Sequence, residues 1–340
     1  MRAVVVGAGL GGLCVAHGLH KAGVDVEVFE ARTGIDDSAQ GYRININATG
    51  HDALRRCLAD EHFQAYERSL HRQSDPAVYR YSPALQLLSR EEVAAAPGAI
   101  DRATTRRMLV NGLAGRVRFG RKVAAIADIG ATDLIVAADG VGSALRRELL
   151  PHAGPQALGW SAIFGRSPVT AANRAWTAPP IMHSRFCGLV DGATVLALCA
   201  YDPPTRTTTE PYVMWVLMGP AGDLPAPGTP PAQLVRFAEN RTASWDSRAT
   251  SVLRHTMAAD TFLTPLRSMT EIPDIPIRTG VPVAFLGDAI HAMSPAGGEG
   301  ANTALGDAAA ARFAPANKPY HHRRGLPLPR RHAPHRRRGA

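Results

Sequence analysis

Close to the end of the chain, an acidic residue is followed by four glycines in one short segment, "GDAIHAMSPAGGEGANTALGD" (residues 287–307). An apolar run, "PVAFL", leads directly into Gly287 and Asp288. Glycine weakens helices and strands, so a cluster of it after an apolar run indicates that the backbone approaches another group closely. A glycine-rich surface loop would also explain the glycines, but it would not explain an Asp at the end of a buried strand.

A second glycine cluster lies at the other end of the chain. In "AVVVGAGLGG" a β-branched run leads into Gly7, Gly9 and Gly12, helical spacing follows up to Gly23, and a further apolar run ends on Glu30. In this context Gly7 permits a tight turn, Gly9 lets the backbone reach a pyrophosphate, and Gly12 lets the helix pack on the strand. Glu30 is then placed to accept hydrogen bonds from an adenosine ribose. The spacing predicts a dinucleotide site, with a turn built for packing alone as the alternative.

The elements between these two ends fall into two kinds. Residues 133–138 form another apolar strand, which breaks at Asp139 into a helix. Residues 154–280 instead show short alternating runs separated by Pro-rich turns, a pattern typical of an antiparallel sheet, and residues 75–89 are expected to add strands to it. In "YVMWVLMG" one face should line a substrate cavity and the other should meet helices. One face carries Tyr212, Met214, Val216 and Met218. The other carries Val213, Trp215 and Leu217.

Three motifs occur in order over nearly all of residues 1–310, namely GxGxxG, DGxxSxxR from Asp139 and GDAxHxxxPxxGxGxN from Gly287. With these motifs the chain resembles the class A flavoprotein aromatic hydroxylases related to p-hydroxybenzoate hydroxylase. The resemblance implies an α/β fold, with a Rossmann-like FAD-binding domain of the GR2 type and an antiparallel-sheet substrate domain. The expected limits are 1–72, 98–153 and 281–313 for the FAD-binding domain, and 73–97 and 154–280 for the substrate domain.

The resemblance also assigns the residues that would bind FAD. Asp288 would hold the ribityl chain, and the backbone from Pro295 to Asn302 would lie along the isoalloxazine, where amides at a helix start stabilise negative charge on the reduced ring. "IDRATTRRML" resembles the segment whose Arg, here Arg102, lies beside the pyrophosphate and ribityl chain. "QGYRININATG" resembles the loop over the dimethylbenzene edge, with Arg43 pointing inward. The full set expected to bind the cofactor is Gly7, Gly9, Gly12, Glu30, Arg32, Arg43, Arg102, Asp139, Asp288, Pro295, Gly298, Gly300, Ala301 and Asn302.

The resembled mechanism uses NADPH or NADH to reduce FAD, after which O₂ gives a flavin C4a-hydroperoxide that hydroxylates a phenolic or polyketide-like aromatic ring. No second dinucleotide fingerprint is visible, which favours transient binding of NAD(P)H. No catalytic side chain is assigned, no nucleophile or metal motif is visible, and His291 is expected to make a structural hydrogen bond. Alternatives are a flavoprotein of the same fold that does not hydroxylate, such as a reductase of isoprenoid double bonds, and a homologue that does not turn over.

The net charge of +9 belongs to the end of the chain. Residues 311–340 hold eight Arg and one Lys with neither Asp nor Glu, so residues 1–310 carry 29 basic and 29 acidic residues. This balance argues against a nucleic-acid-binding fold. No apolar run is long enough for a membrane span, and the four cysteines show no CxxC spacing, so we expect a cytoplasmic protein with buried, reduced cysteines.

Two segments depart from the resembled pattern. Between "RVRFGRKVAAI" and "DLIVAADG" only six residues (127–132) intervene, where the family usually inserts an antiparallel excursion, so this excursion is expected to be shortened. Residues 314–340 hold five Pro and four His without periodicity, which predicts a disordered basic tail. Their composition suggests a GC-rich gene read out of frame, and hence a truncated hydroxylase. A tether to nucleic acid or membrane is the alternative.

Overall fold

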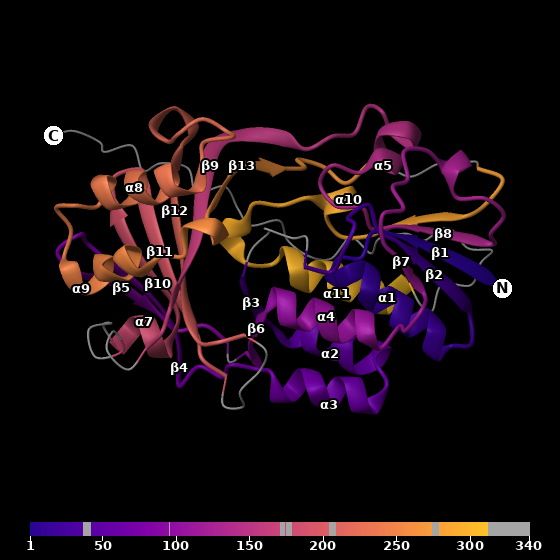
Figure 1. The fold of residues 1–340 in the computed structure, drawn as a ribbon, viewed down its shortest axis with the longest axis horizontal. Coiled ribbons are helices and arrows are strands. Elements are labelled where there is room, and N and C mark those ends of the chain that lie inside the picture. The colour runs from indigo at the N-terminus through magenta and orange to yellow at the C-terminus, as the bar shows by residue number, and fades with distance from the viewer. Residues whose placement is uncertain are drawn as a thin grey trace, which may run out of the picture.

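The computed structural model describes residues 1–36, 42–94, 96–170, 174, 179–203, 209–273 and 279–311. Within them the chain forms two parts that lie side by side, each built on its own sheet (Figure 1). The predicted tail, 314–340, lies outside the described residues, as do residues 40–41 of the segment that leads into Arg43.

The first sheet is parallel, with the strand order β14-β8-β1-β2-β7. Its strands are β1 (Arg2–Val6), β2 (Asp25–Phe29), β7 (Val117–Arg118), β8 (Leu134–Ala137) and β14 (Val283–Phe285). The β-branched run of β1 is buried on both faces, as a central strand of a parallel sheet requires. Between β7 and β8 the chain forms only a short 3₁₀ turn, η1 (Ile126–Asp128), so the predicted shortening of this connection is confirmed.

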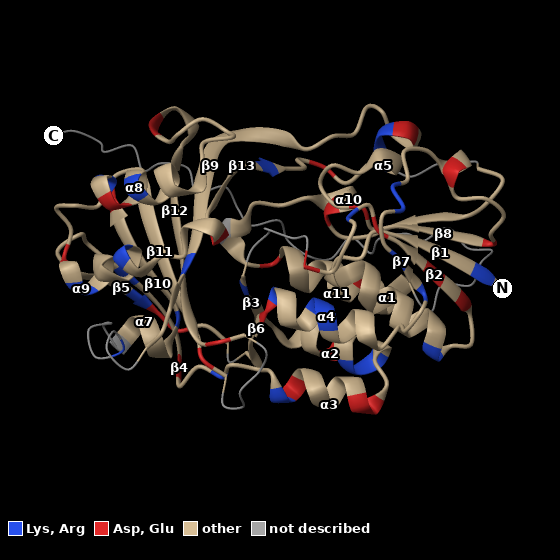
Figure 2. Ribbon diagram, in the orientation of Figure 1, with Lys and Arg blue, Asp and Glu red and all other residues tan. Residues whose placement is uncertain are grey.

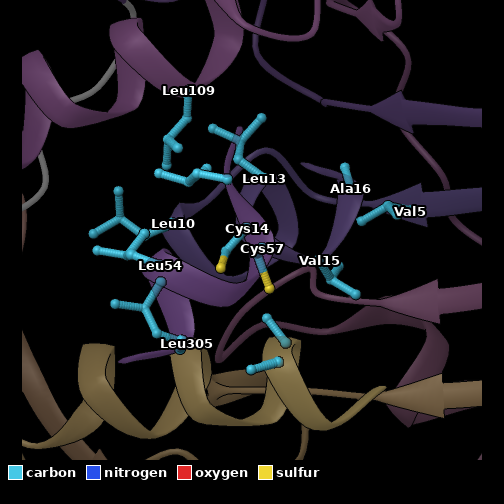
Figure 3. Close-up of a cluster of buried hydrophobic side chains, with 14 of the residues drawn as sticks. Val5, Leu10, Leu13, Cys14, Val15, Ala16, Leu54, Cys57, Leu109 and Leu305 are labelled. Carbon is cyan, nitrogen blue, oxygen red and sulfur yellow. The ribbon is translucent and has the colours of Figure 1, made fainter. Parts of the chain in front are cut away.

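Four helices pack together beside the first sheet and share its core (Figure 1). They are α1 (Leu10–Lys21), α2 (Ala48–Cys57), α4 (Arg102–Asn111) and α11 (Gly300–Ala311), with α3 (Asp60–Arg68) against α4 and α2. Figure 3 shows Leu305 of α11 beside Leu54 of α2 and close to Leu10 of α1. The last described helix therefore completes the core that the first helix begins.

The second sheet has seven strands in the order β13-β9-β12-β11-β10-β4-β5. They are β4 (Asp75–Tyr81), β5 (Leu87–Glu91), β9 (Gln156–Pro168), β10 (Ser184–Asp191), β11 (Thr194–Tyr201), β12 (Tyr212–Pro220) and β13 (Phe262–Ser268). The predicted strands within residues 75–89 are thus confirmed as members of this sheet. One pair, β10 with β4, is parallel, so the sheet is mixed where the sequence predicted an antiparallel one. The two strands are joined through the first part of the molecule, and no hairpin imposes an antiparallel direction on them.

The two faces of β12 have different partners. Trp215 and its alternate neighbours Val213 and Leu217 pack against residues of α8 (Pro231–Arg241), α9 (Ser247–Thr250) and the 3₁₀ turn η3 (Ser251–His255). The opposite face, with Met214, packs with Tyr42, which belongs to the first part of the molecule. The sequence did not show which face of this strand would meet the helices. In the structure the Trp215 face does so, and the face with Met214 is turned toward the first part.

A two-stranded ribbon of β3 (Arg43–Ile46) and β6 (Gly98–Asp101) lies between the two sheets. The remaining short elements are α5 (Ala144–Leu149), α7 (Pro179–His183), η2 (Ala221–Asp223), η4 (Ala258–Asp260), α10 (Asp288–His291) and η5 (Pro295–Gly297). Basic and acidic residues are interspersed along both parts (Figure 2), in line with the neutral balance of residues 1–310. All four cysteines are buried, as predicted.

Candidate cofactor and substrate site

Of the three glycines of the first motif, only Gly9 has open space around it, at the position where the sequence places a phosphate. At Gly7 (φ +108°) an added Cβ would lie 2.3 Å from the Ala138 carbonyl oxygen, and at Gly12 it would lie 2.0 Å from the Gly7 carbonyl oxygen. At Gly9 an added Cβ would meet nothing within 4 Å. Gly9 is also the N-cap of α1 and no side chain caps the helix there. The first amides of α1 are therefore available to an anion.

Glu30 is held rigidly at the end of β2. Its carboxylate accepts hydrogen bonds from the Ala8 amide at 2.9 Å and from the Arg32 amide at 3.0 Å. Arg106 lies 3.5 Å away, and the Glu30 residue is only 9% exposed. The Glu30 carboxylate thus fixes the loop after β1 to the end of β2. This is the place where the sequence predicted a ribose.

Three guanidinium groups gather next to this carboxylate. Burial, and then the charges of Arg32 and Arg106, lower the pKa of Arg102 to about 10, whereas Asp288 and Glu30 act in the opposite sense. Arg106 donates to the Ala8 carbonyl at 2.8 Å. The sequence analysis did not select Arg106, although it follows Arg102 by four residues on α4 and so lies on the same helix face. The cluster carries more positive than negative charge, which suits a pyrophosphate.

The DGxxSxxR motif joins the first sheet to the segment around Asp288. The Asp139 Oδ2 atom accepts from the Ala144 amide at 2.8 Å, whereas its Oδ1 atom is buried and has no hydrogen-bond partner among the described residues. Ser143 caps α5 through the Arg146 amide at 2.9 Å. The Arg146 guanidinium donates to the Ala289 carbonyl at 2.8 Å. The Arg of this motif therefore acts as a structural tie, and Asp139 retains an acceptor for a ligand.

His291 belongs to a buried polar group beneath Asp288. Its Nε2 atom lies 2.5 Å from Asp307 Oδ2, which also accepts from the Gly287 amide at 2.9 Å. Burial lowers the pKa of His291, but the hydrogen bond and charge of Asp307 outweigh it and leave the pKa above its usual value. Burial raises the pKa of Asp288, against the charges of His291 and Arg102. The structural role predicted for His291 is confirmed.

Helix α11 begins at Gly300, so Gly300, Ala301 and Asn302 form its first turn, as the sequence predicted. The Asn302 side chain donates to the Asn45 carbonyl at 3.0 Å and accepts from the Asn47 amide at 3.0 Å. It therefore fixes the helix start to the β3–α2 junction, a role that the sequence did not reveal. Ahead of the helix, Pro295 opens η5, and Gly298 has φ +67° with open space around an added Cβ.

Arg43 stands apart from the other residues predicted to bind the cofactor. It is 6% exposed, and burial lowers its pKa. The side chains that also act on this pKa are Cys199, Tyr212 and Arg185, all from the seven-stranded sheet. The charges around Arg102 are a different set, at the end of the first sheet. The assignment of Arg43 to the cofactor stays a prediction.

Aromatic side chains line the sheet face turned toward the first part. Phe164 and Phe262 stack with centroids 5.2 Å apart, and Tyr42 meets Phe262 edge-on at 6.0 Å. The Arg166 guanidinium lies 5.2 Å from the Tyr42 ring and pairs with Asp260 at 2.7 Å. An apolar, aromatic wall of this kind suits a flat ring.

The residues present fit FAD on three observations. The space at Gly9 is open beside free helix amides, the buried Asp139 Oδ1 atom lacks a partner among the described residues, and guanidinium groups surround Arg102. A dinucleotide would supply the phosphates and hydroxyls that these groups require.

Comparison with family models agrees with this site. The model described as FAD binding domain matches residues 111–314, which is more than half of the chain. The chain belongs to the family of FAD-binding monooxygenases. A second model, described as NAD(P)-binding Rossmann-like domain, matches residues 5–55 around the first glycine loop. The fold class predicted from the sequence and the FAD cofactor are thereby confirmed.

Several curated relatives of this FAD-binding protein are fungal proteins. The dual O-methyltransferase/FAD-dependent monooxygenase elcB of Phaeosphaeria nodorum is 29% identical over 90% of this chain and 39% of its own length. The FAD-dependent monooxygenase adaC of Aspergillus niger is 26% identical over 90% of this chain and 82% of its own. The chain thus spans about two fifths of the dual enzymes, as it does for CTB3 of Cercospora beticola at 41%.

Solved structures share the fold over most of the chain. An FAD-containing monooxygenase from Photorhabdus luminescens is 27% identical, with a TM-score of 0.75 over 91% of this chain and 86% of that one. HpxO of Klebsiella pneumoniae, solved with FAD and uric acid, is 21% identical, with a TM-score of 0.72 over 92% of this chain and 79% of that one.

Among the described residues, no helix is long and apolar enough to cross a membrane.

Proposed function

We propose that the protein is an FAD-dependent monooxygenase that uses NADPH or NADH and O₂ to hydroxylate a small aromatic molecule. The observation that carries the proposal is that Tyr42 joins two surfaces. Its carbonyl accepts from the Arg102 amide at 2.7 Å, at the polar end of the first sheet, and its ring meets Phe262 of the aromatic face at 6.0 Å. One surface suits a dinucleotide and the other suits a ring, so cofactor and substrate can lie next to each other.

In this proposal the first surface holds the cofactor by charge and by backbone. Gly7, Gly9 and Gly12 let the α1 amides reach the pyrophosphate, beside Arg32 and Arg102, and Glu30 receives the ribose. Asp139 and Asp288 accept from ribityl hydroxyls. Backbone at Pro295, Gly298, Gly300, Ala301 and Asn302 lies along the flavin ring, where the first amides of α11 stabilise negative charge. When bound, FAD supplies the redox chemistry that joins NAD(P)H oxidation to O₂ activation.

The second surface positions the ring and keeps water away from it. Phe164, Phe262 and Met214 present apolar side chains, and Tyr42 closes one side of the group. Exclusion of water protects a reactive oxygen species from breakdown before it meets the substrate. The chain needs no nucleophile or metal ligand for this chemistry, because the cofactor carries it.

The test is a search for an oxygenated product. The purified, FAD-loaded protein would be incubated with NADPH or NADH and a panel of phenols and polycyclic phenols under ¹⁸O₂. We expect at least one compound to accelerate nicotinamide oxidation and to gain a single ¹⁸O atom by mass spectrometry. Nicotinamide oxidation that yields only hydrogen peroxide with every compound, or reduction of the compound without oxygen gain, would contradict the proposal.

A further inference from the structure

The β3–β6 ribbon turns a row of polar side chains toward the seven-stranded sheet. Side chains alternate along a strand, and Ile44 and Ile46 pack into the core of the first part, so Arg43 and Asn45 point the other way. Asn45 is paired with Ala99 of β6, and Ala99 is bridged in turn to His71. Cross-strand partners point to the same face. Arg43, Asn45 and His71 therefore share one face, with only a methyl group between the last two.

Each of these three residues has a buried polar atom without a hydrogen-bond partner among the described residues. The atoms are Arg43 Nε and Nη2, Asn45 Oδ1 and His71 Nε2. The other ring nitrogen of His71 lies 2.7 Å from the Asp202 carbonyl, so the ring is fixed in place. Buried polar atoms are almost always paired, and a group of four that share one face indicates a ligand.

No described carboxylate pairs with the Arg43 guanidinium. Asp101 is opposite Arg43 in the ribbon, but its oxygens accept from the Thr104 amide at 2.8 Å and the Tyr212 hydroxyl at 2.9 Å. Burial raises the pKa of the Cys199 thiol and of Tyr212, so these neighbours stay neutral. A buried cation without a counter-ion is strongly unfavourable, and an anion from outside the chain would relieve it.

The two free atoms of Arg43 form one edge of the guanidinium. Nε–H and Nη2–H point in parallel, which matches the two oxygens of a carboxylate. We propose that Arg43 is the anchor of an anion subsite that binds a carboxylate carried by the aromatic substrate, with Asn45 and His71 as additional polar partners. This inference rests on the proposed function, because it supposes that a ring lies against the adjacent aromatic wall.

The test measures equilibrium binding, so that it does not depend on turnover. Benzoate and benzamide share a ring and differ in charge, and both would be titrated into the FAD-loaded protein by calorimetry. The wild type is expected to bind benzoate at least tenfold more tightly than benzamide, since a bidentate charge-assisted pair contributes about tenfold to a hundredfold. Arg43→Gln should abolish this preference and leave benzamide binding unchanged. Arg80→Gln, at a surface pair with Glu91 on the same sheet, serves as the matched control and should keep the preference.

Stability and cofactor affinity separate the competing roles of Arg43. If the guanidinium is held without a counter-ion, Arg43→Gln should unfold at the same or a higher temperature than the wild type without ligand, whereas a purely structural Arg would lower that temperature. FAD affinity should be unchanged, because in this proposal Arg43 faces the substrate and does not bind the cofactor, to which the sequence analysis assigned it. Equal affinity of the wild type for benzoate and benzamide, a lower unfolding temperature for Arg43→Gln, or a loss of FAD binding in that variant would each overturn the subsite. Oxygenated product from neutral phenols alongside equal benzoate and benzamide affinity would overturn the subsite and leave the proposed function intact.

Discussion

Replacing Gly9 with Val should separate cofactor binding from folding. A Cβ added at Gly9 meets nothing within 4 Å in the protein, and the backbone of Gly9 is extended at φ −77° and ψ 177°, which Val adopts readily. The cost to the fold is therefore the weaker N-cap, about 0.5 to 1 kcal/mol. For a chain of this size that corresponds to a fall of roughly 2 °C in the unfolding temperature.

The same side chain would occupy the space in front of the α1 amides. The lost interactions are those of an anion with a helix N-terminus, up to about 2 kcal/mol, and charge-assisted hydrogen bonds of about 1.5 to 3 kcal/mol each. We therefore expect FAD affinity to fall by more than about a hundredfold.

Fluorescence titration of the apoprotein with FAD, together with thermal unfolding, measures both effects. Gly222→Val is the matched control, because Gly222 in η2 also has nothing within 4 Å of an added Cβ and lies away from the first sheet. Undiminished FAD affinity in Gly9→Val would refute the placement of the pyrophosphate at this loop. A large loss of stability in the same variant would refute the reading of the space as a ligand site.

Three other outcomes follow from the contacts described above. Gly12→Ala should destabilise the fold by about 1 to 3 kcal/mol in urea unfolding, because its Cβ would lie 2.0 Å from the Gly7 carbonyl oxygen, and an unfolding curve like the wild type's would disprove the clash. His291 has a raised pKa beside Asp307, so its pairing is fully stabilising below the unfolded pKa of about 6.5 and is lost as pH rises through the higher folded pKa. The stability lost in His291→Gln should then be greater at pH 6 than at pH 9, and a pH-independent difference would argue against the pair. Deletion of residues 314–340 should leave the unfolding temperature and FAD affinity nearly unchanged in calorimetry, and a marked drop in either would show that the tail supports the fold.

The sequence revealed the parts of the site that depend on local backbone. Gly7 and Gly12 are needed because neighbouring carbonyl oxygens leave no room for a Cβ, and the start of α11 at Gly300 follows from its glycine-rich approach. Such features are encoded within a few residues of each other. A motif search can therefore find them without any knowledge of the tertiary structure.

Features that depend on distant partners were not predictable in the same way. Both faces of β12 are apolar, so only the packing of Trp215 against α8 and its neighbours decides which face is turned toward the first part of the molecule. The parallel pairing of β10 with β4 joins segments with no sequence signal in common. Asn302 looked like a backbone contact, yet its side chain bridges to Asn45 and Asn47. Of the features that the sequence analysis missed, only the position of Arg106 could have been predicted, because its spacing of four residues from Arg102 places both on one face of α4.

The position of α11 bears on how the protein is made. Leu305 and Ala308 of α11 fill the same core as Leu13 of α1, although nearly the whole chain separates them. At ribosomal rates of about 5 to 20 residues per second, α1 waits on the order of 15 to 60 seconds for this partner. Nascent chains that stop before β14 should accordingly expose the apolar side of α1, and crosslinking of stalled chains to a ribosome-associated chaperone would reveal it. Helix α1 thus lacks part of its cover until α11 has been made, and the glycine loop that precedes α1 gains this support only then.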